Sequence, residues 1–128
     1  MNKMTKHQKV QVIDDLFSHI GKKPEALNTD EMIYVLESVI PVHVDLVITN
    51  HDEVDELLAI YPYIYQKLIK IYAYFIHKVR EGKQKKLGVI HVNTMMGYRD
   101  CLEQIIKAVK LQYDSLSRRI TNDLERRT

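Results

Sequence analysis

The sequence contains little of what β-rich, disulfide-bonded or membrane-spanning domains need. Its 128 residues include only four glycines, three prolines and one cysteine, and tryptophan is absent. All-β domains place glycine and proline in many tight turns, so this shortage favours helices. The single cysteine, Cys101, excludes an internal disulfide and fits a reducing compartment, and the chain does not open with a signal-peptide pattern. We therefore expect a cytoplasmic protein.

Long hydrophobic runs are also missing. The most apolar stretch, residues 57–76, is interrupted by Pro62, Gln66, Lys67 and Lys70. A lysine at the centre of a bilayer costs about 2.5–3.5 kcal/mol on insertion scales, so we expect no membrane partner or span. With 45% hydrophobic and 28% charged residues, the composition is that of a globular protein, and the length indicates one domain over residues 1–128.

The apolar residues recur at three- and four-residue spacing, which predicts four helices and an all-α, four-helix bundle-like domain. The predicted helices run from about Lys6 to Ile20, from Asn28 or Thr29 until Pro41, from Asn50 to about Glu81, and from Asn93 or Thr94 to about Arg126. Thr5, Asn28 and Asn50 are the predicted N-caps, and Gly21 and Gly82 the predicted stops. Pro62 is predicted to kink or split the third helix.

Two connecting segments have a different pattern. Residues 42–49 alternate apolar and polar side chains, as a strand does, and residues 89–92 are the only segment that could pair with them. A short two-stranded pairing in the connectors therefore stays open, although extended or helical connectors are favoured.

The last predicted helix carries a continuous apolar stripe, formed by Tyr98, Leu102, Ile105, Val109, Tyr113, Leu116, Ile120 and Leu124. A helix of about 30 residues is near 45 Å long, whereas a domain of this size has a radius of gyration of about 14 Å. Part of this long helix is expected to project, and a second copy is the simplest cover for its stripe. We expect a homo-oligomer, and the alternative is a monomeric bundle packed on the whole stripe.

Charge is distributed unevenly along the chain. Residues 1–64 contain 5 Lys and 11 Asp or Glu, a net of −6, and residues 65–128 contain 14 Lys or Arg and 6 Asp or Glu, a net of +8. The basic half could attract phosphate, or pair head to tail with another copy. Alternatively, the two halves neutralise each other inside one fold.

Signatures of catalysis and of metal or cofactor binding are lacking. The six histidines include no i,i+4 pair on a predicted helix, and no phosphate-cradling glycine loop is present. Cys101 has no histidine near it in sequence to act as a base. The His51-Asp52 dipeptide is typical of metal-dependent phosphohydrolases, but Asp52 also suits a first helical turn. We predict a non-enzyme without a metal or cofactor.

Tyrosines and basic residues form the one candidate binding surface. Five of the eight tyrosines lie between residues 61 and 74, interleaved with lysines and followed by a basic loop. Aromatic rings stack on unpaired bases, and cations follow the phosphate backbone. The predicted nucleic-acid-binding residues are Lys67, Lys70, Tyr74, Lys78, Arg80, Lys83, Lys85, Lys86, Arg118 and Arg119. The same tyrosines could instead fill the core, or anchor a protein interface.

The segment from Met95 to Ile120, MMGYRDCLEQIIKAVKLQYDSLSRRI, resembles the C-terminal helices of small phage proteins of the recombination-mediator type, which load a recombinase onto single-stranded DNA. The resemblance covers about a quarter of the chain, and no functional residue is transferred from it. It implies a helical, oligomeric, phage-encoded accessory protein that binds single strands. The alternative hypothesis is an inhibitor or adaptor that docks a host protein with its acidic half or its tyrosines.

Overall fold

The computed structural model describes the backbone of residues 4–40 and 51–127, and the side chains of residues 4–40 and 55–118. This part of the chain contains four α-helices, one short 3-10 helix and no strand. The elements in order are α1 (Lys6–Lys22), η1 (Pro24–Ala26), α2 (Thr29–Glu37), α3 (His51–Gln84) and α4 (Val89–Arg127). The predicted all-α bundle with a long C-terminal helix is confirmed.

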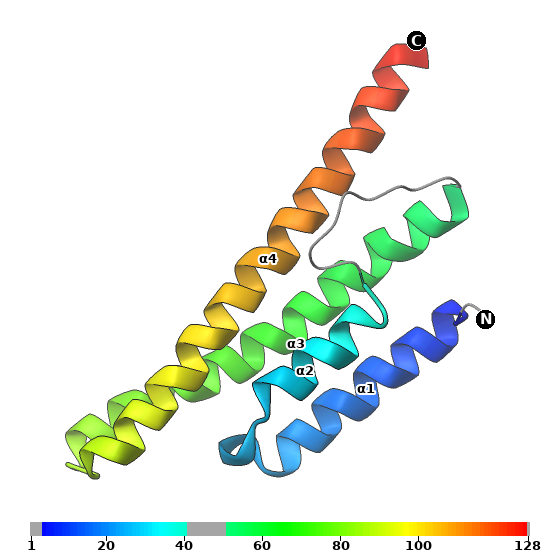
Figure 1. Cartoon of the computed structure of the whole chain (residues 1–128). Coiled ribbons are helices and arrows are strands. Elements are labelled where there is room, and N and C mark those ends of the chain that lie inside the picture. Colours follow the sequence, from blue (N-terminus) through cyan, green and yellow to red (C-terminus); the bar gives the residue numbers. More distant parts are fainter. Residues whose placement is uncertain (1–3, 41–50, 128) are drawn as a thin grey trace.

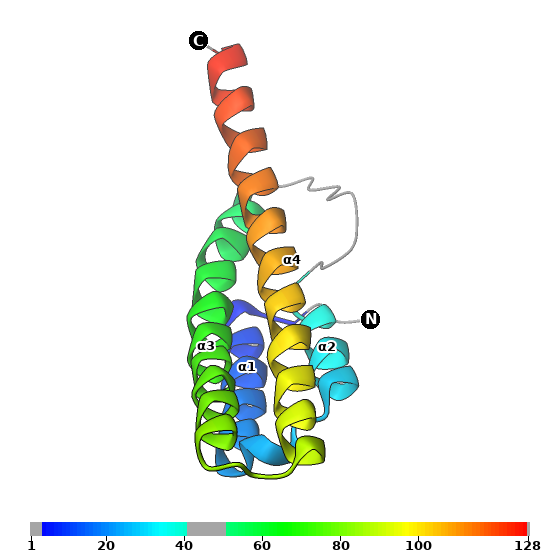
Figure 2. The same cartoon turned by 90° about the vertical axis from the view of Figure 1, so that its left-hand side faces the viewer.

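A long antiparallel hairpin of α3 and α4 organises the bundle (Figure 1). α1 packs on α3 and on α2, and α2 also contacts α4, so the four helices enclose one core. Figure 2 shows α1 and α2 beside the hairpin, while the last turns of α4 extend beyond the other helices. No helix in the described ranges is long and apolar enough to cross a bilayer.

The predicted helix starts on α1 and α2 are confirmed by their caps. The Thr5 hydroxyl accepts the Gln8 backbone N–H, and the Gln8 side chain accepts the Thr5 N–H, which is a complete capping box. The Asn28 side chain accepts the N–H of Glu31. Asn50, the third predicted cap, and Pro41, the predicted end of the second helix, lie outside the described residues; α2 itself ends at Glu37.

Two predicted glycine stops are wrong. Gly21 lies inside α1, which ends one residue later, and no described glycine has a positive φ. Gly82 is buried inside α3, and the left-handed position after this helix is taken by Lys86 with a φ of 53°. Gly82 has a packing role instead, because a Cβ on it would lie 3.0 Å from Cγ2 of Val92 on α4.

The other differences concern Pro62 and residues 89–92. α3 is a single helix through Pro62, so of the two predicted effects the split is wrong, and a kink stays a prediction. Buried residues on both sides of the proline, Ile60, Tyr61 and Ile64, pack the helix on the core and outweigh the local cost. Residues 89–92 form the first turn of α4, so the two-stranded pairing is wrong for them, and residues 42–49 lie outside the described part.

The core contains most of the predicted apolar stripes. On α4, Leu102, Ile105, Val109 and Leu116 are buried, and Tyr98 and Tyr113 are half-buried against them, while Ile120 and Leu124 lie beyond the described side chains. The stripe is thus covered within one chain as far as Leu116. The tyrosines mostly belong to this core: Tyr61 is buried, and Tyr63, Tyr65, Tyr72 and Tyr74 pack against it.

Candidate functional site

Asp14 on α1 contacts two residues of α3, Tyr63 and Lys67, and Lys67 is one of the predicted nucleic-acid-binding residues. The Tyr63 hydroxyl donates a hydrogen bond to Asp14, and Nζ of Lys67 lies 3.5 Å from an oxygen of the same carboxylate. Nζ of Lys67 also lies 4.9 Å from the centroid of the Tyr63 ring. The hydrogen bond to Asp14 raises the pKa of Tyr63. Lys67 therefore joins α3 to α1 instead of standing free in solvent.

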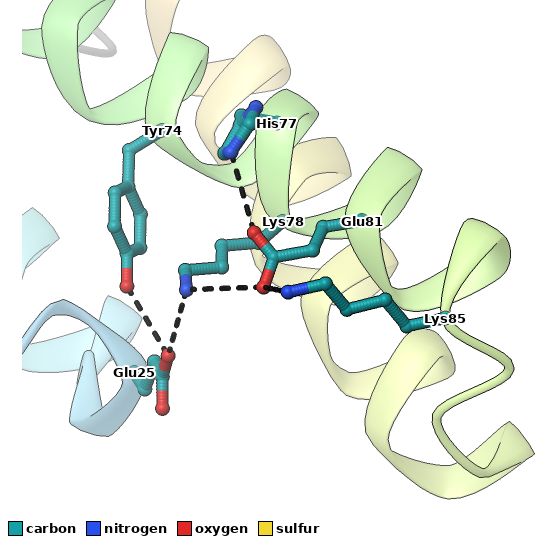
Figure 3. Close-up of polar contacts among 6 residues, drawn as sticks. All are labelled: Glu25, Tyr74, His77, Lys78, Glu81 and Lys85. Atoms are coloured by element: carbon teal, nitrogen blue, oxygen red, sulfur yellow. Dashed lines mark hydrogen bonds and ion pairs between the residues drawn. The ribbon is translucent and has the colours of Figure 1, made fainter.

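A second polar group joins α3 to η1 (Figure 3). Glu25 of η1 accepts a hydrogen bond from the Tyr74 hydroxyl at 3.2 Å, and its carboxylate lies 3.7 Å from Nζ of Lys78. The Lys78 ammonium also lies 5.5 Å from the centre of the Tyr74 ring. Burial, and secondarily Glu25, raises the pKa of Tyr74. Both side chains are thus used in a tertiary contact.

Glu81 is the acidic centre of the same group. Its carboxylate lies 3.3 Å from Nζ of Lys85, 4.0 Å from Nζ of Lys78 and 3.3 Å from Nε2 of His77 (Figure 3). The hydrogen bond from Lys85, followed by the charge of Lys78, lowers the pKa of Glu81. Of the predicted binding residues, Lys67, Tyr74, Lys78 and Lys85 are therefore held by carboxylates of the protein itself. The contacts of Lys67 with Asp14 and of Lys78 with Glu25 cross between the two halves of the chain, which neutralise each other to this extent. The pair of Lys85 with Glu81 lies within the basic half.

The remaining basic residues of α3 and its loop have no such partner. Lys70, Arg80, Lys83 and Lys86 are exposed, and none forms an ion pair with any residue that the structure describes. Arg80, Lys83 and Lys86 lie within two turns of helix and the following loop. Lys70 stands about 20 Å further along α3, given a rise of about 1.5 Å per residue. The unneutralised charge therefore concentrates where α3 ends.

The structure separates the last two predicted residues from this group. Arg118 is exposed on the part of α4 that lies toward the opposite end of the bundle, and the side chain of Arg119 is outside the described part. The predicted set of ten thus does not form one surface.

Two lysines outside the predicted set lie at the same end as the hairpin turn. Lys22 and Lys23 are exposed at the end of α1, and the contact between Lys78 and Glu25 brings the following η1 beside α3. In Figures 1 and 2 the end of α1 and the α3–α4 turn point the same way. We call the exposed cations of this end, Lys22, Lys23, Arg80, Lys83, Lys85 and Lys86, the hairpin end. Their sequence signal is weak, because residues 22 and 80 are far apart in the chain.

Exposed aliphatic side chains adjoin these cations. Leu87, Val89 and Ile90 are 42%, 75% and 84% exposed, and they form the turn and the first residues of α4. We call these three residues the apolar tip. Val92, only two residues further on, is buried against the hairpin, so the exposure ends abruptly. Figure 1 shows the turn protruding beyond α1 and η1.

Three further features were candidates for a site: a groove, the single cysteine and the acidic and histidine side chains. An open groove of about 320 Å³ between α3 and α4 is lined mainly by apolar atoms of Tyr61, Pro62, Tyr65 and Tyr113. Cys101 is a free, half-buried thiol. Within the described residues, no three His, Cys, Asp or Glu side chains lie close enough together to hold a metal. The His51-Asp52 dipeptide lies outside the described side chains.

Comparisons with known proteins give no family for this chain. No protein-family model matches it, and neither a curated protein nor a solved structure does so.

Proposed function

We propose that this protein is a non-enzymatic accessory factor that binds nucleic acid, with a single strand as the most direct probe. In this proposal the cations of the hairpin end hold the phosphate backbone. The observation that carries the proposal is the incomplete neutralisation at this end. Glu25 and Glu81 are already occupied by Lys78 and Lys85, while Arg80, Lys83 and Lys86 have no carboxylate partner in the described part. A cluster of unpaired cations on one end of a domain attracts polyanions.

The internal contacts change the expected mode of binding. Tyr63 and Tyr74 are bonded to Asp14 and Glu25, and their rings are half-buried under Lys67 and Lys78. Base stacking on these rings would require the tertiary contacts of α1 and η1 to break. We therefore assign most of the affinity to phosphate contacts, which predicts a strong dependence on salt.

The test is fluorescence anisotropy of a labelled single strand at several salt concentrations, with Lys83→Gln/Lys86→Gln compared with the unmodified protein. Removing two phosphate contacts lowers the slope of log affinity against log salt by about 1.4, at roughly 0.7 per contact for single strands. The matched control is Lys6→Gln/Lys110→Gln, which removes two exposed lysines that lie far from the hairpin end and form no ion pair within the described residues. Equal effects of the two variants, or affinity that does not change with salt, would refute the proposal.

A second candidate function is the docking of a host protein through α2. Tyr34 is 77% exposed on this helix, and the exposed acidic residues Asp30 and Glu37 lie on either side of it in sequence. Tyrosine is enriched at protein interfaces, where its ring supplies contact area at low entropic cost. Pull-down with the unmodified protein and with Tyr34→Ala tests this candidate. A partner retained equally by both proteins argues against this face, and loss of the partner supports it.

A further inference from the structure

The exposed aliphatic residues of the bundle are concentrated at one place. Six large hydrophobic side chains are exposed among the described residues, and three of them, Leu87, Val89 and Ile90, fall within four consecutive positions. The other three, Tyr34, Ile69 and Leu111, are scattered on three different helices. Single exposed apolar residues are common on protein surfaces, whereas a concentration at a protruding turn indicates a contact.

The turn that presents these residues is tightly built. The N–H of Leu87 donates to the carbonyl oxygen of Gly82 at 2.9 Å, and the N–H of Val92 donates to that of Gly88 at 3.2 Å. Beneath the turn, Val79, Val92 and Met95 are buried, and Gly82 allows Val92 to approach α3 closely. Such support holds the apolar tip in place before a partner arrives, which lowers the entropic cost of binding.

The partner must combine negative charge with apolar surface over a short distance, because Lys83, Lys85 and Lys86 adjoin the apolar tip in sequence and in the turn. Nucleic acid has this combination wherever bases are unpaired or unstacked, since phosphates flank the exposed base faces. Aliphatic side chains such as leucine and isoleucine are known to act as wedges between base steps. An anionic bilayer fits less well, because residues 83–91 contain no aromatic anchor and offer only three aliphatic side chains.

We infer that the apolar tip is a wedge that inserts between bases of unpaired or locally opened nucleic acid while the lysines of the hairpin end hold the flanking phosphates. This inference rests on the proposed function and names its preferred substrate. The protein binds a strand interruption or a bubble in preference to a continuous duplex. The preference for open structures then comes from aliphatic contacts, in place of the tyrosine stacking that the internal hydrogen bonds prevent.

The experiment compares three DNA molecules of equal length: a single strand, a continuous duplex, and the same duplex with a central bubble that contains 2-aminopurine. We expect the unmodified protein to bind the bubble at least about tenfold more tightly than the duplex, because the wedge does not have to unstack paired bases there. A change in 2-aminopurine fluorescence on binding reports the insertion directly.

The decisive variant is Val89→Ser/Ile90→Ser, which removes two exposed side chains and leaves the packing of Val92 unchanged. Its matched control is Leu111→Ser, which removes an aliphatic side chain that is 68% exposed on the same helix. We expect the tip variant to lose the preference for the bubble and the fluorescence change, and the control to keep both. Equal thermal unfolding by circular dichroism establishes that the variants are folded.

The outcomes separate the inference from the proposed function. If Lys83→Gln/Lys86→Gln leaves binding to all three molecules unchanged, the proposed function is refuted together with the wedge. If that variant weakens binding but the tip variant keeps the preference for the bubble, only the wedge is overturned. A further outcome would favour a lipid surface. If the unmodified protein sediments with anionic vesicles and the tip variant does not, while both bind DNA equally, the wedge is overturned.

Discussion

Gly82 of α3 and Val92 of α4 approach so closely that a methyl group on the glycine would lie 3.0 Å from Cγ2 of the valine. Both residues are buried, and they join the two helices one turn below the loop that connects them. This contact sets the spacing of the hairpin where the basic and apolar side chains of the candidate site are presented.

Gly82→Ala and Gly97→Ala form a matched pair of helix substitutions. Both replace a helical glycine, which by itself stabilises a helix interior by about 0.5–1 kcal/mol. A Cβ on Gly97 meets nothing within 4 Å, whereas one on Gly82 crowds Val92. We expect Gly97→Ala to raise the free energy of unfolding. The free energy of unfolding of Gly82→Ala should be about 1–3 kcal/mol lower than that of Gly97→Ala, because the added methyl group overpacks the contact with Val92. Chemical denaturation measures both, and equal values would contradict the crowded contact.

Tyr61 is expected to make the fold sensitive to strong alkali. Burial raises its pKa from 10.0 to about 12, because the charged phenolate is poorly solvated in the core. The pKa of Tyr61 in the folded protein is above its pKa in the unfolded chain. The contribution of the buried, neutral hydroxyl to the free energy of unfolding is therefore complete below pH 10 and is lost as pH rises toward 12. The pKa values of Tyr63 and Tyr74 are also raised, so tyrosinate absorbance should show several late-titrating groups, one of which, near pH 12, is removed by Tyr61→Phe. Simultaneous titration of all tyrosines in the folded protein would count against this burial.

Glu81→Gln should affect both acid stability and binding. Hydrogen bonding to Lys85 and the charge of Lys78 lower the pKa of Glu81 below 4.5, so its contribution to stability is present above pH 4.5 and disappears as pH falls through the lowered pKa. The variant should therefore lose stability at neutral pH and show a weaker dependence on acid pH in denaturation curves.

The same substitution removes a carboxylate that competes with phosphate for Lys78 and Lys85. We expect Glu81→Gln to bind a single strand more tightly at low salt, with a steeper salt dependence. Unchanged affinity would show that these two lysines do not contribute to the phosphate-binding surface. Glu103→Gln is the control, because Glu103 pairs with Lys107 on α4 at 3.3 Å, away from the hairpin end.

Self-association stays a prediction and depends on the end of α4 that extends beyond the other helices. The apolar stripe is covered within the chain as far as Leu116, and the sequence continues it with Ile120 and Leu124. We expect the unmodified protein to be a dimer or larger in light scattering after size exclusion, and Ile120→Glu/Leu124→Glu to be a monomer. A monomeric unmodified protein at high concentration would refute the prediction.

Local signals in the sequence predicted the helices, whereas contacts between distant residues decided the rest. Thr5 and Asn28 cap their helices through bonds to residues three positions away, so residue type and local position were enough to predict them. Gly82 looked like a stop because its close approach to Val92 exists only after the hairpin has formed.

The candidate site could be predicted only in part for the same reason. The basic residues are visible in the sequence, but their neutralisation is not: Lys67 meets Asp14 and Lys78 meets Glu25 across more than fifty residues of chain. These tertiary ion pairs neutralise some of the predicted binding residues and leave others free to bind phosphate. The contact of Lys78 with Glu25 also brings Lys22 and Lys23 to the end of the bundle that carries the α3–α4 turn. The exposure of Val89 and Ile90 is not visible in the sequence either, because it depends on which face of α4 packs against α3.

The hairpin also has a consequence for how the chain folds. α3 and α4 are joined by only four residues, so their first contacts close a very short loop at little entropic cost. Pairing can therefore proceed from the turn outward, with each step joining residues only slightly more distant in sequence, a topology associated with rapid folding. The end of the molecule proposed to meet nucleic acid is then also the place where its tertiary structure begins.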